Sequence, residues 1–172
     1  IAVTRNIHRK GYKIKTQSNY GYLELEELTL FSEENISSLI RRASVCINLI
    51  GILYEKRKNH FKTIHTDFPS LLSKLAKKNN LKQFIHVSAL GIEDAIDSHY
   101  AISKLEGERE AKKNFNKTLI LKPSIVYSVD DNFTTSLMTL LNRLPIMPLY
   151  YNGNTKFTPL HVADLANIIF EV

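Results

Sequence analysis

The fold is decided by two neighbouring stretches, Ile85-His86-Val87-Ser88-Ala89 and Tyr100-Ala101-Ile102-Ser103-Lys104. The first has the apolar composition of a buried strand that ends in a hydroxyl group, and the second has the composition of a helix. Residues four positions apart lie on one face of a helix, so Tyr100 and Lys104 would point toward the same spot. We therefore predict a strand, a short loop and a helix, with polar side chains gathered where the strand ends.

Ser88, Tyr100 and Lys104 together predict a site that moves a proton on or off a substrate oxygen. An isolated tyrosine has a pKa of about 10 and is a poor proton carrier at neutral pH. A lysine held beside the phenol would favour the phenolate and lower the pKa of Tyr100 toward a working range. Ser88, at the carboxyl end of the preceding strand, would supply a hydroxyl group to the same pocket.

The Tyr-x-x-x-Lys spacing occurs twice in the chain, as Tyr100 with Lys104 and as Tyr54 with Lys58. A chain of 172 residues with 8 tyrosines and 16 lysines contains roughly one such pair by chance, so the spacing alone has little weight. Tyr54 precedes the charged run Glu55-Lys56-Arg57-Lys58, which has no apolar stripe. Tyr100 alone combines a preceding strand, a hydroxyl group and a helical setting, so we select its pair as the candidate site.

The composition is that of an ordinary globular domain, with 44% apolar and 23% charged residues in a chain of 172. The longest uncharged stretches, such as residues 144–155, are much shorter than the roughly 20 residues of a membrane span. The single cysteine, Cys46, lies in an apolar run and fits a small core residue in a reducing compartment. The six histidines show no metal-site spacing, so we expect no metal site.

The formal net charge is +6, with basic runs at residues 56–58, 77–78 and 112–113. Such runs can meet nucleic acid or an anionic membrane surface. No aromatic residues alternate with them and no nucleic-acid-binding motif accompanies them. We therefore interpret the runs as solvated loops and helix ends, and we expect no nucleic-acid partner.

Strands and helices are expected to alternate along the chain. The strands are predicted at residues 1–4, 22–30, 45–51, 84–88 and 118–121, with a turn at residues 6–11. The run at 45–51 is almost continuously apolar, as in a strand covered on both faces. In the strand at 22–30, the leucines are candidates for burial: Leu23, Leu25, Leu28 and Leu30.

The helices are predicted from apolar stripes and from capping residues. The first follows the N-cap Ser32, and the second has Asp67 as its cap with Pro69 in its first turn. The third carries Tyr100, and two more are predicted at residues 132–144 and 164–172, the former ended by prolines. The inward-facing residues and the terminating prolines are Ile36, Leu39, Ile40, Ala43, Phe68, Leu71, Leu72, Leu75, Leu165, Ile168, Ile169, Pro145 and Pro148.

This alternation predicts an α/β domain with a mainly parallel sheet and right-handed crossovers. Ligands of such sheets bind at the carboxyl ends of the strands, where Arg5, Asn48, Gly51 and Ser88 would share one crevice. Arg5 would pair with a 2′-phosphate and favour NADP, unless it is a solvent-exposed turn residue. Asn48 would hold backbone or ribose, with a buried structural amide as the alternative.

A glycine-rich turn between a strand and a helix is missing from this chain. Dinucleotide-binding folds use such a turn to bring backbone N–H groups to the pyrophosphate. The six glycines lie at positions 11, 21, 51, 91, 107 and 153, too far apart to form one. We expect the missing strand, turn and helix, roughly 30 residues, to precede Ile1 in a longer protein.

Five segments resemble the short-chain dehydrogenase/reductase superfamily. Their order and spacing are most similar to the atypical branch that contains the alpha-subcomplex accessory subunit of respiratory complex I and its bacterial relatives. The resemblance covers nearly the whole chain from Ala2 onward. The segments are Asn48-Leu49-Ile50-Gly51-Ile52-Leu53-Tyr54-Glu55, His86-Val87-Ser88-Ala89-Leu90-Gly91, Tyr100 to Lys104 with Glu106-Gly107-Glu108, Leu121-Lys122-Pro123-Ser124-Ile125-Val126-Tyr127 and Phe157-Thr158-Pro159-Leu160-His161-Val162-Ala163-Asp164.

The resemblance implies a Rossmann-type, doubly wound domain over residues 1–172 that lacks its first βα unit and is truncated at both ends. A smaller substrate-side region would start at about residue 145. The resemblance also implies bound NAD(P)(H), with NADP(H) preferred and NAD(H) as the alternative. It assigns hydroxyl, proton-transfer and ribose-binding roles to Ser88, Tyr100 and Lys104 in that order. It places Pro123 and Ser124 near the nicotinamide and Arg5 near the adenosine phosphate.

Two functions compete at this point, and a third stays open. The chain can be a complex I accessory or assembly subunit with a structural nucleotide, located in the mitochondrial matrix, or in the cytoplasm of bacteria, with peripheral membrane contact. It can instead be an active oxidoreductase or epimerase that acts on a small-molecule substrate through Ser88, Tyr100 and Lys104. The third option is a redox-sensing regulator that binds NADP(H) and catalyses no reaction. An intact Tyr–Lys pair does not decide among them, because the resemblance implies that the complex I branch retains the pair.

Overall fold

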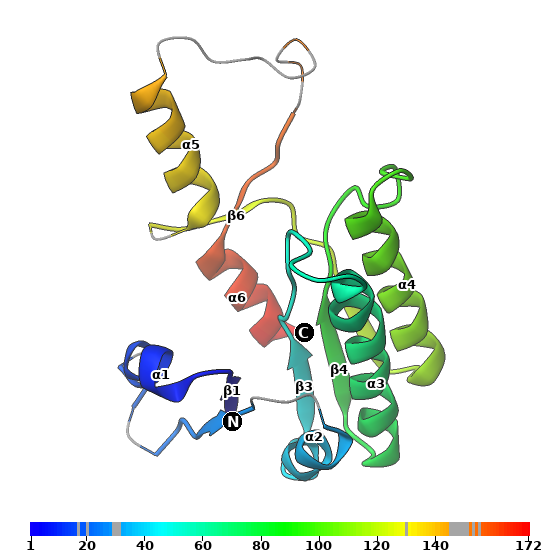
Figure 1. Cartoon of the computed structure of the whole chain (residues 1–172). Coiled ribbons are helices and arrows are strands. Elements are labelled where there is room, and N and C mark those ends of the chain that lie inside the picture. Colours follow the sequence, from blue (N-terminus) through cyan, green and yellow to red (C-terminus); the bar gives the residue numbers. More distant parts are fainter. Residues whose placement is uncertain are drawn as a thin grey trace.

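The computed structural model describes residues 1–16, 18–19, 21–28, 32–129, 131–144, 152, 154 and 156–172. Strands and helices alternate along these residues, and each strand pair found in them is parallel (Figure 1). The predicted α/β class with a mainly parallel sheet is confirmed. The strands, which form the sheets β1–β2, β3–β4–β5 and β6–β7, are β1 (Ala2–Thr4), β2 (Leu25–Glu27), β3 (Val45–Asn48), β4 (Gln83–Val87), β5 (Thr118–Leu121), β6 (Val126–Tyr127) and β7 (Leu160–His161).

The core lies between the sheet β3–β4–β5 and the helices packed on it. Figure 1 shows α3 and α4 side by side against this sheet, and α2 at the end where the strands begin. The sheet register sets Asn48 opposite His86 and Val87 opposite Leu121. The helical elements are α1 (Ile7–Lys15), α2 (Glu33–Ile40), η1 (Lys62–Asp67, a π-helical segment), α3 (Phe68–Lys78), α4 (His99–Asn114), α5 (Asn132–Arg143) and α6 (Val162–Glu171). The buried core residues are Leu28, Ile36, Ile40, Phe68, Leu72, Leu75, Ala76, Leu81, Phe84, Ala111 and Phe115.

The expectation that β3 is covered on both faces was wrong. Cys46 packs against the core and Asn48 is buried, but Val45 and Ile47 are 40% and 46% exposed. Side chains alternate between the two faces of a strand, so one whole face of β3 is open within the described residues. β3 also pairs with β4 alone in this part of the chain, so its other edge is free.

The N-terminal segment differs from the prediction because a helix replaces the expected turn. α1 begins after Asn6, whose side-chain oxygen accepts a hydrogen bond from the backbone of Arg9 at 2.8 Å. Gly11 lies inside this helix, where a Cβ atom would be only 3.1 Å from the side chain of Ile7. The glycine therefore serves close packing rather than a turn. The strand predicted at residues 22–30 is reduced to β2, and its expected core residue Leu30 lies outside the described residues.

The helix around Pro69 begins earlier than predicted. Asp67 has helical backbone angles and makes no capping hydrogen bond, because η1 runs directly into α3. α4 approaches η1 closely at Gly107. A Cβ atom at Gly107 would lie 1.8 Å from the carbonyl oxygen of His65, so the approach requires a glycine.

The remaining elements agree closely with the predictions. Ser32 caps α2 by accepting a hydrogen bond from Asn35, and β5 has the predicted bounds. α5 also matches, whereas its predicted terminators Pro145 and Pro148 lie outside the described residues. The prediction failed for Ile168 of α6, which is 42% exposed rather than inward-facing. Leu165 and Ile169 of the same helix are half-buried.

Candidate functional site

Lys104 and Ser88 meet at the carboxyl end of β4. Lys104 projects from α4 and is 5% exposed, and its Nζ donates a hydrogen bond to the carbonyl oxygen of Val87 at 3.1 Å. Ser88 follows Val87 directly and is also 5% exposed, but its Oγ has no hydrogen-bond partner in the structure. A buried hydroxyl group without a partner is costly, so this oxygen is positioned to bind a ligand group. Burial lowers the pKa of Lys104, and Glu108 opposes that shift.

Tyr100 lies on the same helix, but its electrostatics differ from the prediction. Its ring makes edge-to-face contacts with His65 and Phe61, with centroids 5.3 and 5.9 Å apart. Burial raises the pKa of Tyr100, so the expected lowering by Lys104 was wrong for this structure. The physical reason is that the ammonium group is held at the Val87 carbonyl, while the phenol lies among rings. Within the described residues, the Tyr100 hydroxyl forms no hydrogen bond with Ser88 or Lys104.

Asn48 is a buried amide at the end of β3 that is bound on both sides. Its Nδ2 donates to Nδ1 of His86 at 3.0 Å, and its Oδ1 accepts from the backbone N–H of Ile50 at 3.1 Å. Both polar ends of the amide are therefore occupied by the protein. This arrangement favours the structural alternative for Asn48, whose side chain shapes the turn after β3.

Gly51 lies at the centre of that turn, beside α4. A Cβ atom on Gly51 would lie 3.6 Å from Nζ of Lys104 and 3.8 Å from Nε2 of His65. The structure therefore brings the turn after β3, the turn after β4 and the start of α4 together. These are the carboxyl ends of parallel strands, where α/β sheets bind ligands.

Pro123 and Ser124 lie next to the turn after β4. The backbone N–H of Ser88 donates to Leu121 at 2.8 Å, and that of Leu90 donates to Pro123 at 3.0 Å. These two bonds extend the pairing of β4 with β5 beyond the strands. Pro123 and Ser124 are both half-buried, so they belong to the same edge as Ser88.

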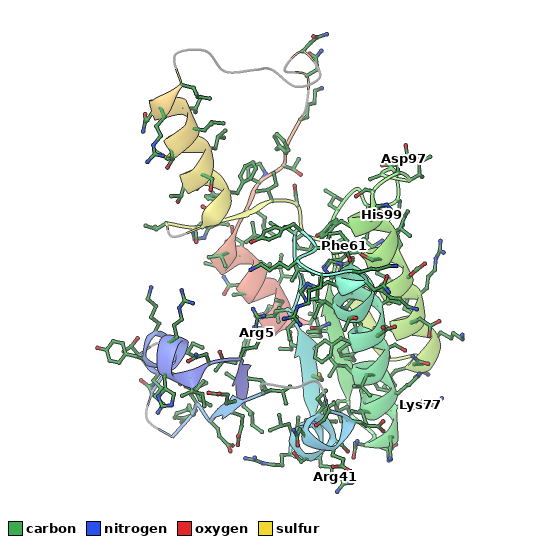
Figure 2. The ribbon with its side chains drawn as sticks, viewed as in Figure 1. Arg5, Arg41, Phe61, Lys77, Asp97 and His99 are labelled. Carbon is green, nitrogen blue, oxygen red and sulfur yellow. The ribbon has the colours of Figure 1, made fainter. Side chains whose placement is uncertain are left out.

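Arg5 does not contact the other candidate residues. It follows β1, which belongs to a separate sheet, and its side chain is exposed. Figure 2 shows Arg5 beyond the upper end of β1, below Phe61 and His99 and above Lys77 and Arg41. Arg5 thus lies at the strand end where it was predicted, with the solvent-exposed alternative still open.

Two histidines and a serine belong to the site although the prediction omitted them. His65 and His86 are each 1% exposed, and burial lowers the pKa of both to about 4, with Lys104 adding to the shift. His65 Nδ1 lies 2.9 Å from Oγ of Ser103. Ser103 lies between Tyr100 and Lys104, so the sequence could have identified it as a site residue. No sequence pattern identifies His65, because its partners Ile52 and Ser103 are 13 and 38 residues away.

Two further expectations concern metals and membranes. Among the described residues, no group of three or more histidine, cysteine or acidic side chains could hold a metal ion. None of the helices described is long and apolar enough to span a bilayer.

The curated relatives of this chain include subunits of mitochondrial NADH dehydrogenase (ubiquinone). No protein-family model matches the sequence. The chain is 27% identical over 173 residues to the mitochondrial NADH dehydrogenase (ubiquinone) 1 alpha subcomplex subunit 9 of Dictyostelium discoideum, covering 100% of this chain and 48% of that protein. It is 26% identical to the alpha subcomplex subunit 9 of Mus musculus, covering 89% of this chain and 41% of that protein. It is 24% identical to the 40 kDa subunit of NADH-ubiquinone oxidoreductase of Neurospora crassa, covering 91% and 40%. The chain thus spans about half the length, or less, of these relatives.

Solved structures with the same fold include a reductase and a dehydratase that are named for dTDP sugars. A dTDP-4-dehydrorhamnose reductase of Clostridium acetobutylicum has a TM-score of 0.72 at 18% identity, with 94% of this chain and 65% of that chain covered. A dTDP-glucose 4,6-dehydratase of Bacillus anthracis, solved with NAD, has a TM-score of 0.71 at 16% identity, with 95% and 57% covered. At these identities the likeness establishes the fold alone. The chain has the predicted Rossmann-type α/β fold, and its predicted resemblance to the complex I alpha-subcomplex subunit is confirmed.

Proposed function

We propose that this chain is the nucleotide-binding part of an accessory or assembly subunit of NADH:ubiquinone oxidoreductase, with NADP(H) as a structural ligand. The observation that carries the proposal is the similarity to the alpha subcomplex subunit 9 of Dictyostelium discoideum, which extends over 100% of this chain. The names of the relatives place them in mitochondria. We therefore infer a mitochondrial protein that contacts other complex I subunits from the matrix side, peripheral to the inner membrane, with a bacterial cytoplasmic protein as the alternative.

The geometry around Lys104 supports a nicotinamide nucleotide as the ligand. Lys104 presents a buried ammonium group, and Ser88 presents a buried hydroxyl group without a protein partner. Ribose hydroxyls and a carboxamide are the kinds of group that such donors bind. Pro123 and Ser124 would contact the nicotinamide from the neighbouring turn. A bound nucleotide would supply hydride-transfer chemistry, and this chain would supply the groups that orient it and hold a proton.

Arg5 supports NADP(H) over NAD(H). Its guanidinium group is exposed at the carboxyl end of a parallel strand, where it is free of ion pairs with other described residues. A planar guanidinium group suits bidentate binding of a 2′-phosphate. Titration of nucleotide fluorescence should give tighter binding of NADPH than of NADH, and Arg5→Ala should remove most of the difference. Equal affinities in the unaltered protein would contradict the NADP preference.

An active oxidoreductase or epimerase is the second candidate, and Ser88 favours it. The free Oγ of Ser88 could polarise a substrate carbonyl or alcohol, while Tyr100 exchanges the proton. In this structure the pKa of Tyr100 is raised by burial, so the phenol would act as an acid that donates its proton. The substrate would be a small molecule that binds beside Gly51, which is exposed in the turn after β3.

Native purification of the full-length protein with its partners separates the two candidates. Co-migration with membrane-bound NADH:quinone oxidoreductase, with NADP(H) recovered from the complex, supports the subunit. A free oligomer that catalyses a reaction dependent on NAD(P)(H) supports the active enzyme and contradicts the role as a complex I subunit. The unaltered protein and a Tyr100→Phe variant should co-migrate equally, because complex assembly does not require proton transfer.

A further inference from the structure

The turn after β3, residues 48–52, is held on both sides by buried histidines. On the strand side, His86 accepts a hydrogen bond from Asn48, whose Oδ1 accepts in turn from Ile50. On the helix side, the backbone N–H of Ile52 donates to Nε2 of His65 at 3.1 Å. Gly51 lies between these two attachments and next to Lys104. The segment that lines the candidate nucleotide site is therefore fixed by the buried side chains of Asn48, His86 and His65.

The bonds of His65 define its tautomer. Nε2 accepts from Ile52, so Nδ1 must carry the hydrogen and donate to Oγ of Ser103 at 2.9 Å. Ser103 Oγ then donates to the carbonyl oxygen of Tyr100 at 2.8 Å. Burial keeps His65 neutral near pH 7, which this arrangement requires. One imidazole ring thus connects the turn after β3 to the first turn of α4.

The surroundings of His65 leave it little freedom to adopt another arrangement. Phe61 stacks on the ring with centroids 5.3 Å apart, and Tyr100 meets it edge-on at the same separation. Thr66 ties the next residue to α4 by donating to the carbonyl oxygen of Ser103 at 3.0 Å. Gly107 allows the backbone of His65 itself to approach α4. The ring is therefore fixed in position before any ligand arrives.

We propose that His65 is a positioning residue for the nucleotide, because it holds the turn after β3 against α4 and so keeps Gly51 beside Lys104. The inference rests on the proposed nucleotide-binding function. Without the bond to His65, the N–H of Ile52 would lose its partner and the turn would gain freedom. A nucleotide would then have to order the turn as it binds, which weakens its affinity.

Two substitutions separate the two bonds of His65 in the full-length protein. The amide of Gln reaches the position of Nε2, so His65→Gln can still accept from Ile52 but loses Ser103. The amide of Asn reaches the position of Nδ1, so His65→Asn keeps Ser103 but loses Ile52. His99→Gln and His99→Asn are the matched controls, because His99 is exposed at the start of α4.

The experiment measures amide hydrogen exchange at Ile52 and the Kd for NADPH. We expect His65→Asn to exchange at Ile52 at least tenfold faster and to bind NADPH about fivefold to tenfold more weakly. His65→Gln should restore both values to within about threefold, and the His99 variants should change neither. Equal effects of Asn and Gln at position 65, or unchanged exchange at Ile52 in both, would overturn the proposal.

The same data distinguish a failure of the proposed nucleotide-binding function from a failure of the proposed role of His65. If the unaltered protein binds neither NADPH nor NADH, the proposed function fails, and the role of His65 in binding fails with it, whatever Ile52 shows. If neither variant at position 65 folds, the ¹⁵N chemical shifts of His65 in the unaltered protein decide. Protonation at Nδ1 with a change on NADPH addition supports the proposal, and protonation at Nε2 or no change overturns it.

Discussion

The chain contains the same Tyr-x-x-x-Lys spacing in two regions, and the structure treats them in opposite ways. Tyr54 is 66% exposed in an irregular segment, where its ring contacts Lys56 with the ammonium 5.8 Å from the centroid. Tyr100 and Lys104 lie on α4, with the lysine almost fully buried. Identical spacing therefore gives a solvated surface in one region and a candidate site in the other. The packing of α4 makes the difference.

The largest expected effect on stability comes from disrupting the packing of α4 against η1. Gly107→Ala would place a Cβ atom 1.8 Å from the carbonyl oxygen of His65, so α4 must move away from η1. We expect a loss of about 3 kcal/mol in the free energy of unfolding, measured with denaturant. Gly51→Ala is the control, because its Cβ would meet ordinary contacts of 3.6 Å or more. Equal stability of the two variants would show that the packing of α4 does not distinguish the regions.

A smaller effect is expected from acidification, which acts on the region of Tyr100. The folded pKa of His65 is about 4, below the ordinary value of 6.5, so the unfolded chain binds the extra proton between these values. The stability contributed by neutral His65 is complete above pH 6.5 and is lost as the pH falls toward 4. We expect His65 to account for a loss of about 1 kcal/mol per pH unit in this window, beside a similar loss from His86, whose pKa is also lowered to about 4. His65→Gln should lower this slope, and an unchanged slope would contradict the burial of neutral His65.

The smallest effect is expected from the tyrosines themselves. Tyr100→Phe removes a hydroxyl group that makes no protein hydrogen bond with Ser88 or Lys104, and it keeps the ring contacts with His65 and Phe61. We expect NADPH affinity to stay within about threefold of the unaltered protein, while any turnover is abolished. Tyr54→Phe should change neither quantity. Loss of NADPH binding in Tyr100→Phe alone would make Tyr100 part of the binding site rather than a proton carrier.

The sequence predicted the elements whose determinants are local. β5 and α5 follow from apolar runs and their flanking residues, and α2 follows from the cap at Ser32. The strand end at Ser88 and the helix that carries Lys104 were predicted for the same reason.

The failures came from contacts between distant segments. Gly11 suggested a turn, but the structure buries it in a helix against Ile7 and Leu25. The direction of the pKa shift of Tyr100 depends on how deeply the ring is buried by Phe61 and His65, which no local pattern shows. The hydrogen bonds of His65 to Ile52 and Ser103 join residues far apart in sequence, so they could be identified only from the structure.

The most direct test of the account compares Lys104→Met with Lys58→Met in an NADPH titration of the full-length protein. Methionine matches the apolar stem of lysine as far as Cε and lacks only the ammonium group, so the folded state should persist, as thermal unfolding of both variants would verify. We expect at least tenfold weaker NADPH binding for Lys104→Met and a change of less than twofold for Lys58→Met. Equal affinities of the two variants, or a larger loss for Lys58→Met, would contradict it.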